Sequence, residues 1–174
     1  MPSSSHTFRQ ILENQARTLL GALPDRWGRM DMMSRSALVG VGRVLSEAGL
    51  LADDAPVLRN GHNGGLIVGS RRGSLASDLE YAETLLLGPG MASPHLFGYT
   101  LPNIALAEAA IQYKLTGPAY VLIDENPFDN AVHEAGQWLS DLPGEKKIMV
   151  AGVLDVIPGQ HDSEITSKFT LIQQ

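Results

Sequence analysis

Residues 93–126, SPHLFGYTLPNIALAEAAIQYKLTGPAYVLIDEN, decide the fold of this chain. We expect an irregular loop as far as Tyr99 and then a helix, with Thr100 as its N-cap and Pro102 in its first turn. Alanines leave little bulk on this helix, so a neighbouring element can approach it closely. The apolar side chains that recur at helical spacing are Ile104, Ala107 and Ile111.

A short strand and a second helix complete this stretch. Residues 119–123 form an apolar run, which is typical of a strand covered on both faces, so we expect this strand in the middle of a sheet. Asn126, Pro127 and Asp129 then have the pattern of an N-cap, a first-turn proline and an acid near the positive end of a helix. The order of loop, helix, turn, strand and helix predicts an α/β layer architecture with a buried sheet.

The rest of the chain extends this pattern of helices and strands. We expect further helices over residues 6–23, 31–48, 75–87 and 128–142, and strands over residues 66–68, 148–154 and 168–172. The last two strands are expected to pair, and residues 51–65 to form a loop. Gly40 and Gly42 each cost a helix about 1 kcal/mol relative to alanine unless packing compensates. We therefore expect the helix that contains them to be pressed against a neighbour.

Length and composition restrict the possible functions. At 174 residues the chain is predicted to be a single domain over residues 1–174, in which residues 1–28 form a tail and an amphipathic helix. A net charge of −6 argues against binding to nucleic acid. No stretch resembles a signal peptide or a membrane span, so we expect a cytoplasmic protein with no membrane partner. The absence of cysteine excludes disulfides, thiol catalysis and thiolate metal sites.

Few residues indicate chemistry by their spacing. The five histidines do not have the spacing of a zinc site, and GHNGG at residues 61–65 lacks the lysine of a phosphate-binding loop. We therefore expect no metal and no cofactor. Arg71 and Arg72 are weak candidates for binding a small anion, such as a phosphate of coenzyme A or of a carrier protein.

Residues 93–120 resemble the segment of the β-ketoacyl synthase family that leads to the nucleophile. These condensing enzymes of the thiolase superfamily have a serine-proline pair, then LPN before a helix, then GP before a strand. Residues 29–35, RMDMMSR, are similar to the family's R-x-D-x-x-s helix, and residues 65–69 to its following G-l-x-x-G strand. The resemblance extends with gaps over residues 29–173. It implies a thiolase-like half-fold, in which a mixed buried sheet carries helices on both faces.

The chain departs from this family at the nucleophile. The family has a cysteine nine positions beyond the glycine of GP, and Asn126 stands nine positions beyond Gly117 here. An amide is not a nucleophile, so the resemblance implies no acyl transfer at this position. The family's catalytic histidines come from a C-terminal half that this chain does not resemble. We therefore expect no condensation by this chain alone.

The first functional hypothesis is a non-catalytic ketosynthase-like protein. It would be an accessory or dimerising subunit in fatty-acid or polyketide-type biosynthesis, and its partner would be a second copy, a ketosynthase-type subunit or an acyl carrier protein. In the family, the strand before the nucleophile pairs with another chain across a two-fold axis. The residues that the resemblance assigns to this pairing are Tyr120, Val121, Leu122 and Ile123.

The second hypothesis is an enzyme that acts on acyl or coenzyme A thioesters with different chemistry. Asp124, Glu125 and His133 could supply an acid and a base. Neighbouring strand residues point to opposite faces, however, so we favour a capping or surface role for both acids. A third possibility is a protein with no specific ligand.

Overall fold

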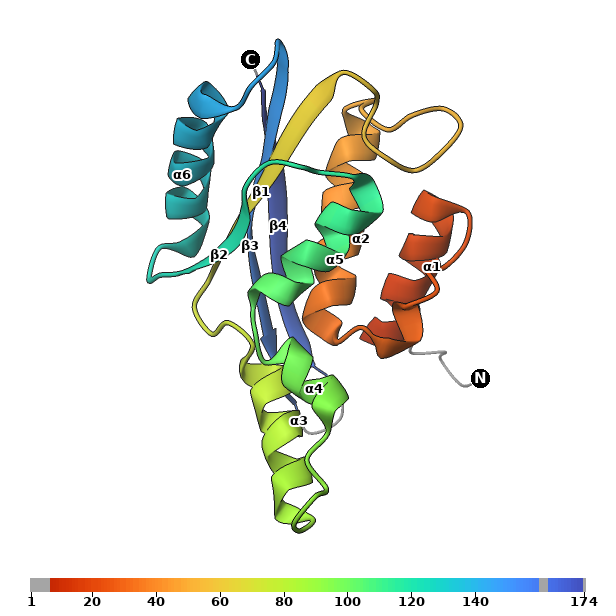
Figure 1. The fold of residues 1–174 in the computed structure, drawn as a ribbon, viewed down its shortest axis with the longest axis vertical. Coiled ribbons are helices and arrows are strands. Elements are labelled where there is room, and N and C mark those ends of the chain that lie inside the picture. Colours follow the sequence, from red (N-terminus) through yellow and green to blue (C-terminus); the bar gives the residue numbers. More distant parts are fainter. Residues whose placement is uncertain (1–6, 160–162, 174) are drawn as a thin grey trace, which may run out of the picture.

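The computed structural model describes residues 7–159 and 163–173, and a four-stranded sheet lies at its centre (Figure 1). The predicted tail, residues 1–5, lies outside the described residues. The strand order is β2-β1-β3-β4. β1 runs parallel to β2 and β3, and β4 runs antiparallel to β3, so the sheet is mixed as predicted. The strands are β1 (His62–Ser70), β2 (Ala119–Ile123), β3 (Lys146–Ile157) and β4 (Glu164–Gln173).

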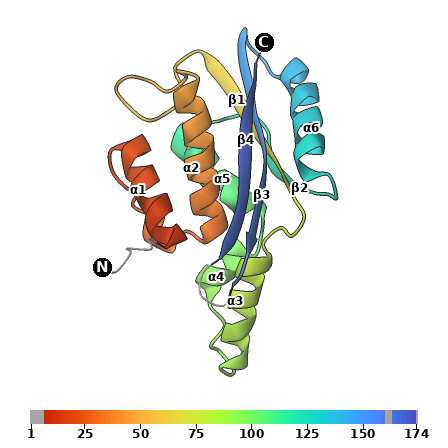
Figure 2. The ribbon, with the colours of Figure 1, turned by 180° about the vertical axis from the view of Figure 1, so that it is seen from behind.

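Helices cover both faces of this sheet, which confirms the predicted layers. α2 and α5 pack on one face with α1 outside them, and α6 packs on the other face (Figure 1, Figure 2). α3 and α4 contact each other and project from one end of the sheet (Figure 1). The helices are α1 (Phe8–Leu20), the 3-10 helix η1 (Trp27–Arg29), α2 (Met32–Glu47), α3 (Leu75–Leu86), α4 (Pro94–Tyr99), α5 (Asn103–Tyr113) and α6 (Pro127–Asp141).

Each face of the sheet buries its own apolar core. The side chains of β1 alternate between the two cores, since Leu66 and Val68 lie in the larger core with α2 and α5. Ile67 lies in the smaller core, beneath α6. The residues that α6 contributes to the smaller core are Ala131, Ala135 and Leu139. The central strand is therefore buried on both faces.

Gly40 and Gly42 confirm the predicted close packing of α2. A Cβ atom at Gly40 would overlap the ring of Phe169 on β4. A Cβ atom at Gly42 would overlap the hydroxyl end of Tyr113 on α5. That hydroxyl donates a hydrogen bond to the carbonyl oxygen of Leu38, 2.9 Å away. The two glycines let α2 lie close to the sheet and to α5, and this packing offsets their low helix propensity.

The prediction that β2 lies in the middle of the sheet was wrong. β2 has the predicted bounds, but it forms an edge, and β1 is its single partner among the described residues. α5 contacts β2 on one face and α6 contacts it on the other. An apolar sequence is needed to bury these two faces, and that need is the same for an edge strand as for a central one.

The predicted bounds of β1 were too narrow. The strand begins at His62, before the predicted residues 66–68, because Gly64 and Gly65 continue it instead of forming a loop. A Cβ atom at Gly65 would lie 2.7 Å from the carbonyl oxygen of Pro118. These glycines therefore permit close approach of a neighbouring segment within the sheet.

Residues 94–99 form a helix where an irregular loop was predicted. Ser93 caps this helix, since its hydroxyl oxygen accepts a hydrogen bond of 3.2 Å from the N–H three residues later. Thr100 ends α4 and does not begin α5, so its predicted role as N-cap was wrong. α5 begins further on, at Asn103, and has no side-chain cap.

Candidate functional site

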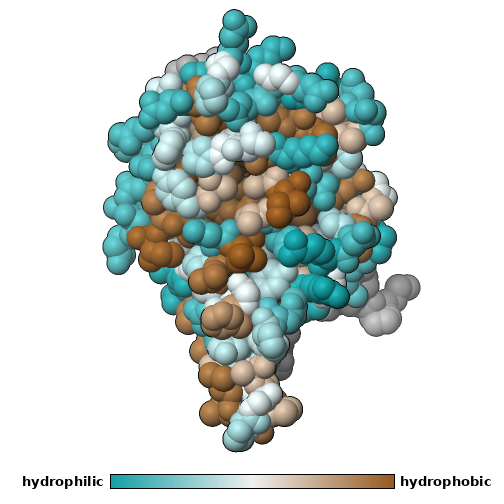
Figure 3. Space-filling model, in the orientation of Figure 1, coloured by the Kyte–Doolittle hydropathy of each residue, from teal (hydrophilic) through white to brown (hydrophobic). Residues whose placement is uncertain are grey.

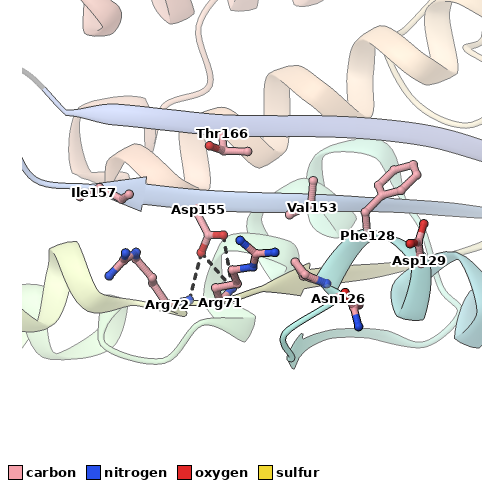
Figure 4. Close-up of a pocket in the computed structure, with 10 residues that line it drawn as sticks. Arg71, Arg72, Asn126, Phe128, Asp129, Val153, Asp155, Ile157 and Thr166 are labelled. Carbon is pink, nitrogen blue, oxygen red and sulfur yellow. Dashed lines mark hydrogen bonds between the residues drawn. The ribbon is translucent and has the colours of Figure 1, made fainter.

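A cavity of about 390 Å³ opens at the end of the sheet where β1 and β2 finish (Figure 4). The carboxyl ends of parallel strands are the usual place for a ligand in an α/β fold. The cavity brings together Arg71, Arg72 and Asn126, which the sequence singled out separately. The other residues that line it are Pro127, Phe128, Asp129, Val153, Asp155, Ile157 and Thr166.

Asp155 on β3 holds the turn that follows β1. Its buried carboxylate accepts a hydrogen bond of 2.6 Å from the Ser70 hydroxyl. It also accepts hydrogen bonds from the N–H groups of Arg71 and Arg72 at 3.1 and 3.0 Å (Figure 4). The Ser70 hydroxyl oxygen accepts in turn from the Gly73 N–H at 2.7 Å. The sequence analysis missed Asp155, because a single acid near the end of an apolar run does not reveal a partner on a distant strand.

The Arg71 side chain joins this turn to the start of α6. Its Nε and Nη2 atoms donate hydrogen bonds to the carbonyl oxygen of Glu125, at 3.1 and 3.0 Å. Gly69 closes the same junction, since a Cβ atom there would overlap the backbone of Pro127. Both arginines are exposed and line the cavity, but the Arg71 guanidinium is engaged by the Glu125 carbonyl, so Arg72 is the one better placed to contact an anion.

Asn126 occupies the N-cap position of α6, as predicted, but its side chain makes no capping hydrogen bond. Its φ of −113° and ψ of 62° lie outside the extended conformation that a capping residue usually adopts. The Asn126 N–H donates to the Asp124 carboxylate at 2.7 Å. This hydrogen bond, with the Asn130 side chain and the Glu125 N–H, lowers the pKa of Asp124. The predicted side-chain cap was therefore wrong, and the Asn126 amide lines the cavity.

Asp124, Glu125 and His133 are not gathered at this cavity. Asp124 and Glu125 are engaged at the junction before α6, through a carboxylate and a carbonyl group respectively. His133 is exposed on α6, and its Nε2 atom lies 3.2 Å from the side-chain nitrogen of Gln137. None of the three residues lines the cavity. The geometry therefore gives no support to an acid and base pair made of these groups.

β2 directs alternate backbone groups toward β1 and away from the sheet. The carbonyl oxygen of Pro118 and the N–H of Asp124, which flank the strand, both bond to β1. Because backbone groups alternate in direction along a strand, the residues between them that face β1 are Tyr120 and Leu122. The residues whose N–H and C=O groups face outward are Ala119, Val121 and Ile123.

The side chains of the predicted pairing residues have different environments. The Tyr120 hydroxyl contacts Glu134 and Trp138 on α6, and burial together with the Glu134 hydrogen bond raises the pKa of Tyr120. Leu122 packs against the smaller core beneath α6, and Val121 packs against the larger core on the opposite face of the sheet. The Ile123 side chain is 61% exposed.

α5 covers one point of the outer edge of β2. The side-chain oxygen of Asn103 accepts a hydrogen bond of 2.8 Å from the Val121 N–H.

Within residues 7–159 and 163–173, no three metal-ligating side chains are grouped as a metal site. In the same part of the chain, no helix is long and apolar enough to cross a membrane.

Two comparisons with known proteins find similarity. The family model described as "Beta-ketoacyl synthase, N-terminal domain" matches residues 3–171. A solved structure described as "The ishigamide ketosynthase/chain length factor" matches with a TM-score of 0.63 at 18% sequence identity. The match covers 91% of this chain and 47% of that one, so this chain spans about half the length of its structural neighbour. The likeness confirms the predicted thiolase-like half-fold. No curated protein sequence matches the chain.

Proposed function

Since this chain belongs to the family of β-ketoacyl synthase N-terminal domains, we propose that it is a non-catalytic member that pairs through β2 with a second ketosynthase-type chain. Its role would be that of an accessory or dimerising subunit in fatty-acid or polyketide-type biosynthesis. A single observation carries this proposal: within the described residues, no strand lies along the outer edge of β2, the strand that leads to Asn126.

The junction between β2 and α6 supports the absence of thiol catalysis. Asn126 lies at the start of a 15-residue helix, where N–H groups and the helix dipole would stabilise a thiolate. A carboxamide at the same place forms hydrogen bonds but does not attack a thioester. No cysteine elsewhere in the chain can replace it. The site keeps the position of a nucleophile and lacks the nucleophile itself.

The two edges of the sheet differ in how well they are protected from pairing. β4, at one edge, carries the charged residues Glu164 and Lys168. β2, at the other edge, reads AYVLI and carries no charge. Charged side chains on an edge strand oppose the addition of another strand, and their absence favours it. The uncharged edge is therefore the one suited to pair with a second chain.

Apolar side chains are exposed beside β2 and also at the end of α3. The Ile123 side chain extends the β2 edge. Leu101, just before α5, and Ile111, on α5, are also exposed, and α5 contacts β2. Residues 85–87, at the end of α3, form a second exposed apolar group. Figure 3 shows apolar side chains across the middle of one face and at the narrow end of the molecule. A test of the proposal must distinguish these two surfaces.

Pairing of β2 with its own copy would follow two-fold symmetry. Antiparallel alignment brings the outward groups of Ala119 and Ile123 of one chain opposite those of the other. The hydrogen bond between the Val121 N–H and the Asn103 side chain would then either break or remain, and if it remains it would keep that N–H out of the pairing between the two chains. The contact is self-complementary, so a dimer closes without leaving a free β2 edge.

Molar mass in solution tests this pairing. We expect light scattering coupled to size exclusion to give the mass of a dimer for the wild type at micromolar concentration. Ile123→Lys places a charge at the pairing edge, and we expect it to weaken association by at least about tenfold because the charge must be desolvated. Leu86→Lys is the matched control, since Leu86 is 87% exposed in the other apolar group; we expect it to remain a dimer.

Two results would contradict the proposal. One is a dimer that persists in Ile123→Lys but dissociates in Leu86→Lys, which would assign pairing to the end of α3. The other is a monomeric wild type that also fails to co-purify with a ketosynthase-type chain from its native host. A monomer that does co-purify with such a chain supports a heteromeric accessory role.

A further inference from the structure

A second cavity, of about 160 Å³, lies between the start of α2 and the pair α3 and α4. It is separate from the cavity at the end of β1 and shares no lining residue with it. Its character is set by charged and titratable side chains, which are Arg9, Arg29, Asp31, Arg35, Glu80, His95 and Tyr99. Three arginines thus face two carboxylates.

Arg35 is the unusual member of this group. It lies on α2 with only 4% of its surface exposed, and its Nε atom is buried without a hydrogen-bond partner. The ion pairs found among the described residues involve other arginines and leave Arg35 without a carboxylate within 4.0 Å. Its guanidinium lies 5.3 Å from the centre of the Trp27 ring, a contact that does not neutralise the charge.

Asp31, a carboxylate that lines the cavity with Arg35, is already engaged. One oxygen of Asp31 accepts a hydrogen bond of 2.8 Å from the Ser34 N–H, as N-cap of α2. The other accepts from the Ser77 hydroxyl at 2.6 Å. Glu80, the second carboxylate, is exposed to solvent. Burial and the charge of Arg9 lower the pKa of Arg35, and they outweigh the opposite effects of Asp31, Glu13 and Tyr99.

A buried arginine Nε without a hydrogen-bond partner is costly, because it has lost water and, although Asp31 and Glu13 act on the charge from a distance, no carboxylate of the described residues forms an ion pair with it. An oxyanion in the cavity would supply a paired counter-charge. Guanidinium groups suit phosphate in particular, since two parallel N–H groups match two of its oxygens. Arg9 and Arg29 are exposed at the cavity, so they can contact an anion that enters from solvent.

The geometry points to a binding site for a phosphate group, held by Arg35 from below and by Arg9 and Arg29 at the rim. A volume of 160 Å³ is well below that of sites that enclose a drug-sized molecule. The site therefore takes either free inorganic phosphate or the terminal phosphate of a larger molecule whose remainder stays outside. This inference does not depend on the pairing of β2 or on the role of Asn126.

Thermal unfolding and ³¹P NMR titration of the full chain test the site. We expect inorganic phosphate to raise the melting temperature of the wild type saturably, relative to chloride at equal ionic strength. Arg35→Gln should abolish that rise. Arg43→Gln is the matched control, since it removes the same charge from an exposed position on the same helix, and it should respond as the wild type does. Arg9→Gln, at an exposed residue, should weaken phosphate binding several-fold even if Arg35→Gln does not fold.

Titration with phenyl phosphate and with acetate then identifies which ligand the site takes. Phenyl phosphate that binds as tightly as inorganic phosphate shows that the site accepts the end of a larger molecule, and binding of inorganic phosphate alone shows that it takes the free ion. Both results support the inference. Acetate that stabilises the protein as much as phosphate would overturn the assignment to phosphate. Equal phosphate affinity in the wild type and Arg35→Gln, or no stabilisation beyond that of chloride, would overturn the site.

Discussion

At the scale of single residues, Asp155 determines the shape of the larger cavity. Its carboxylate accepts hydrogen bonds from the hydroxyl of Ser70 and from the N–H groups of Arg71 and Arg72, so it ties the turn after β1 to β3. Arg71 can then reach the Glu125 carbonyl and join the turn to α6. A single buried acid on β3 therefore positions both arginines that were expected to meet an anion.

Replacement of Asp155 by alanine should loosen this turn. Ser70 and two backbone N–H groups would lose their acceptor inside the protein, at a cost of about 2–4 kcal/mol in the free energy of unfolding. Urea denaturation measures this cost, and hydrogen exchange should show faster exchange of the Arg71 and Arg72 amides. Asp129→Ala is the control, since Asp129 lines the same cavity but is exposed; it should cost less than about 1 kcal/mol. Unchanged exchange at both amides in Asp155→Ala would contradict this role.

The identity of site residues could be predicted only where the local sequence is informative. Arg71 and Arg72 follow a strand and Asn126 precedes a helix, so their positions at element ends were predicted from neighbours in the chain. Asp155 acts through a partner 85 residues away in the sequence, and no local sequence pattern predicts a contact between residues so far apart. Arg35 was equally hidden, because an arginine in a helical run is usually solvated, and only the packed structure shows it buried.

At the scale of secondary-structure elements, the apolar periodicity predicted the type of most segments. It did not predict which strand lies at the edge, since α5 and α6 bury β2 from both sides. It also failed for β1, because Gly64 and Gly65 look like a loop unless the close approach of Pro118 is known. α4 was missed because a helix of six residues has too few turns to show a period.

The start of α6 can be tested by restoring a thiol. Asn126→Cys places a sulfur beside the first N–H groups of the helix, near Arg71 and Arg72. We expect the pKa of this thiol to fall below the ordinary value of about 8.5. The helix dipole alone should lower this pKa by about 0.2–0.7. The pH dependence of the rate of alkylation by iodoacetamide measures it. Gln137→Cys, exposed two to three turns into the same helix, should keep an ordinary pKa. Equal pKa values for the two thiols would contradict the claim that the start of α6 stabilises a thiolate at position 126.

At the scale of the whole molecule, the sheet has one edge protected by charge and one edge without it. The β2 edge carries outward backbone groups, an exposed Ile123 side chain and a single side-chain cover from Asn103. That residues 1–174 form one domain, and that the protein is cytoplasmic, stay predictions.

Hydrogen exchange along β2 tests the central claim, that this edge pairs with a second chain, most directly. The N–H groups of Tyr120 and Leu122 face β1 and should be protected at every protein concentration. The N–H groups of Ala119 and Ile123 face outward, and we predict that they become protected as concentration rises and the protein associates. If these two amides still exchange as freely exposed groups in the fully associated protein, β2 is not the pairing edge.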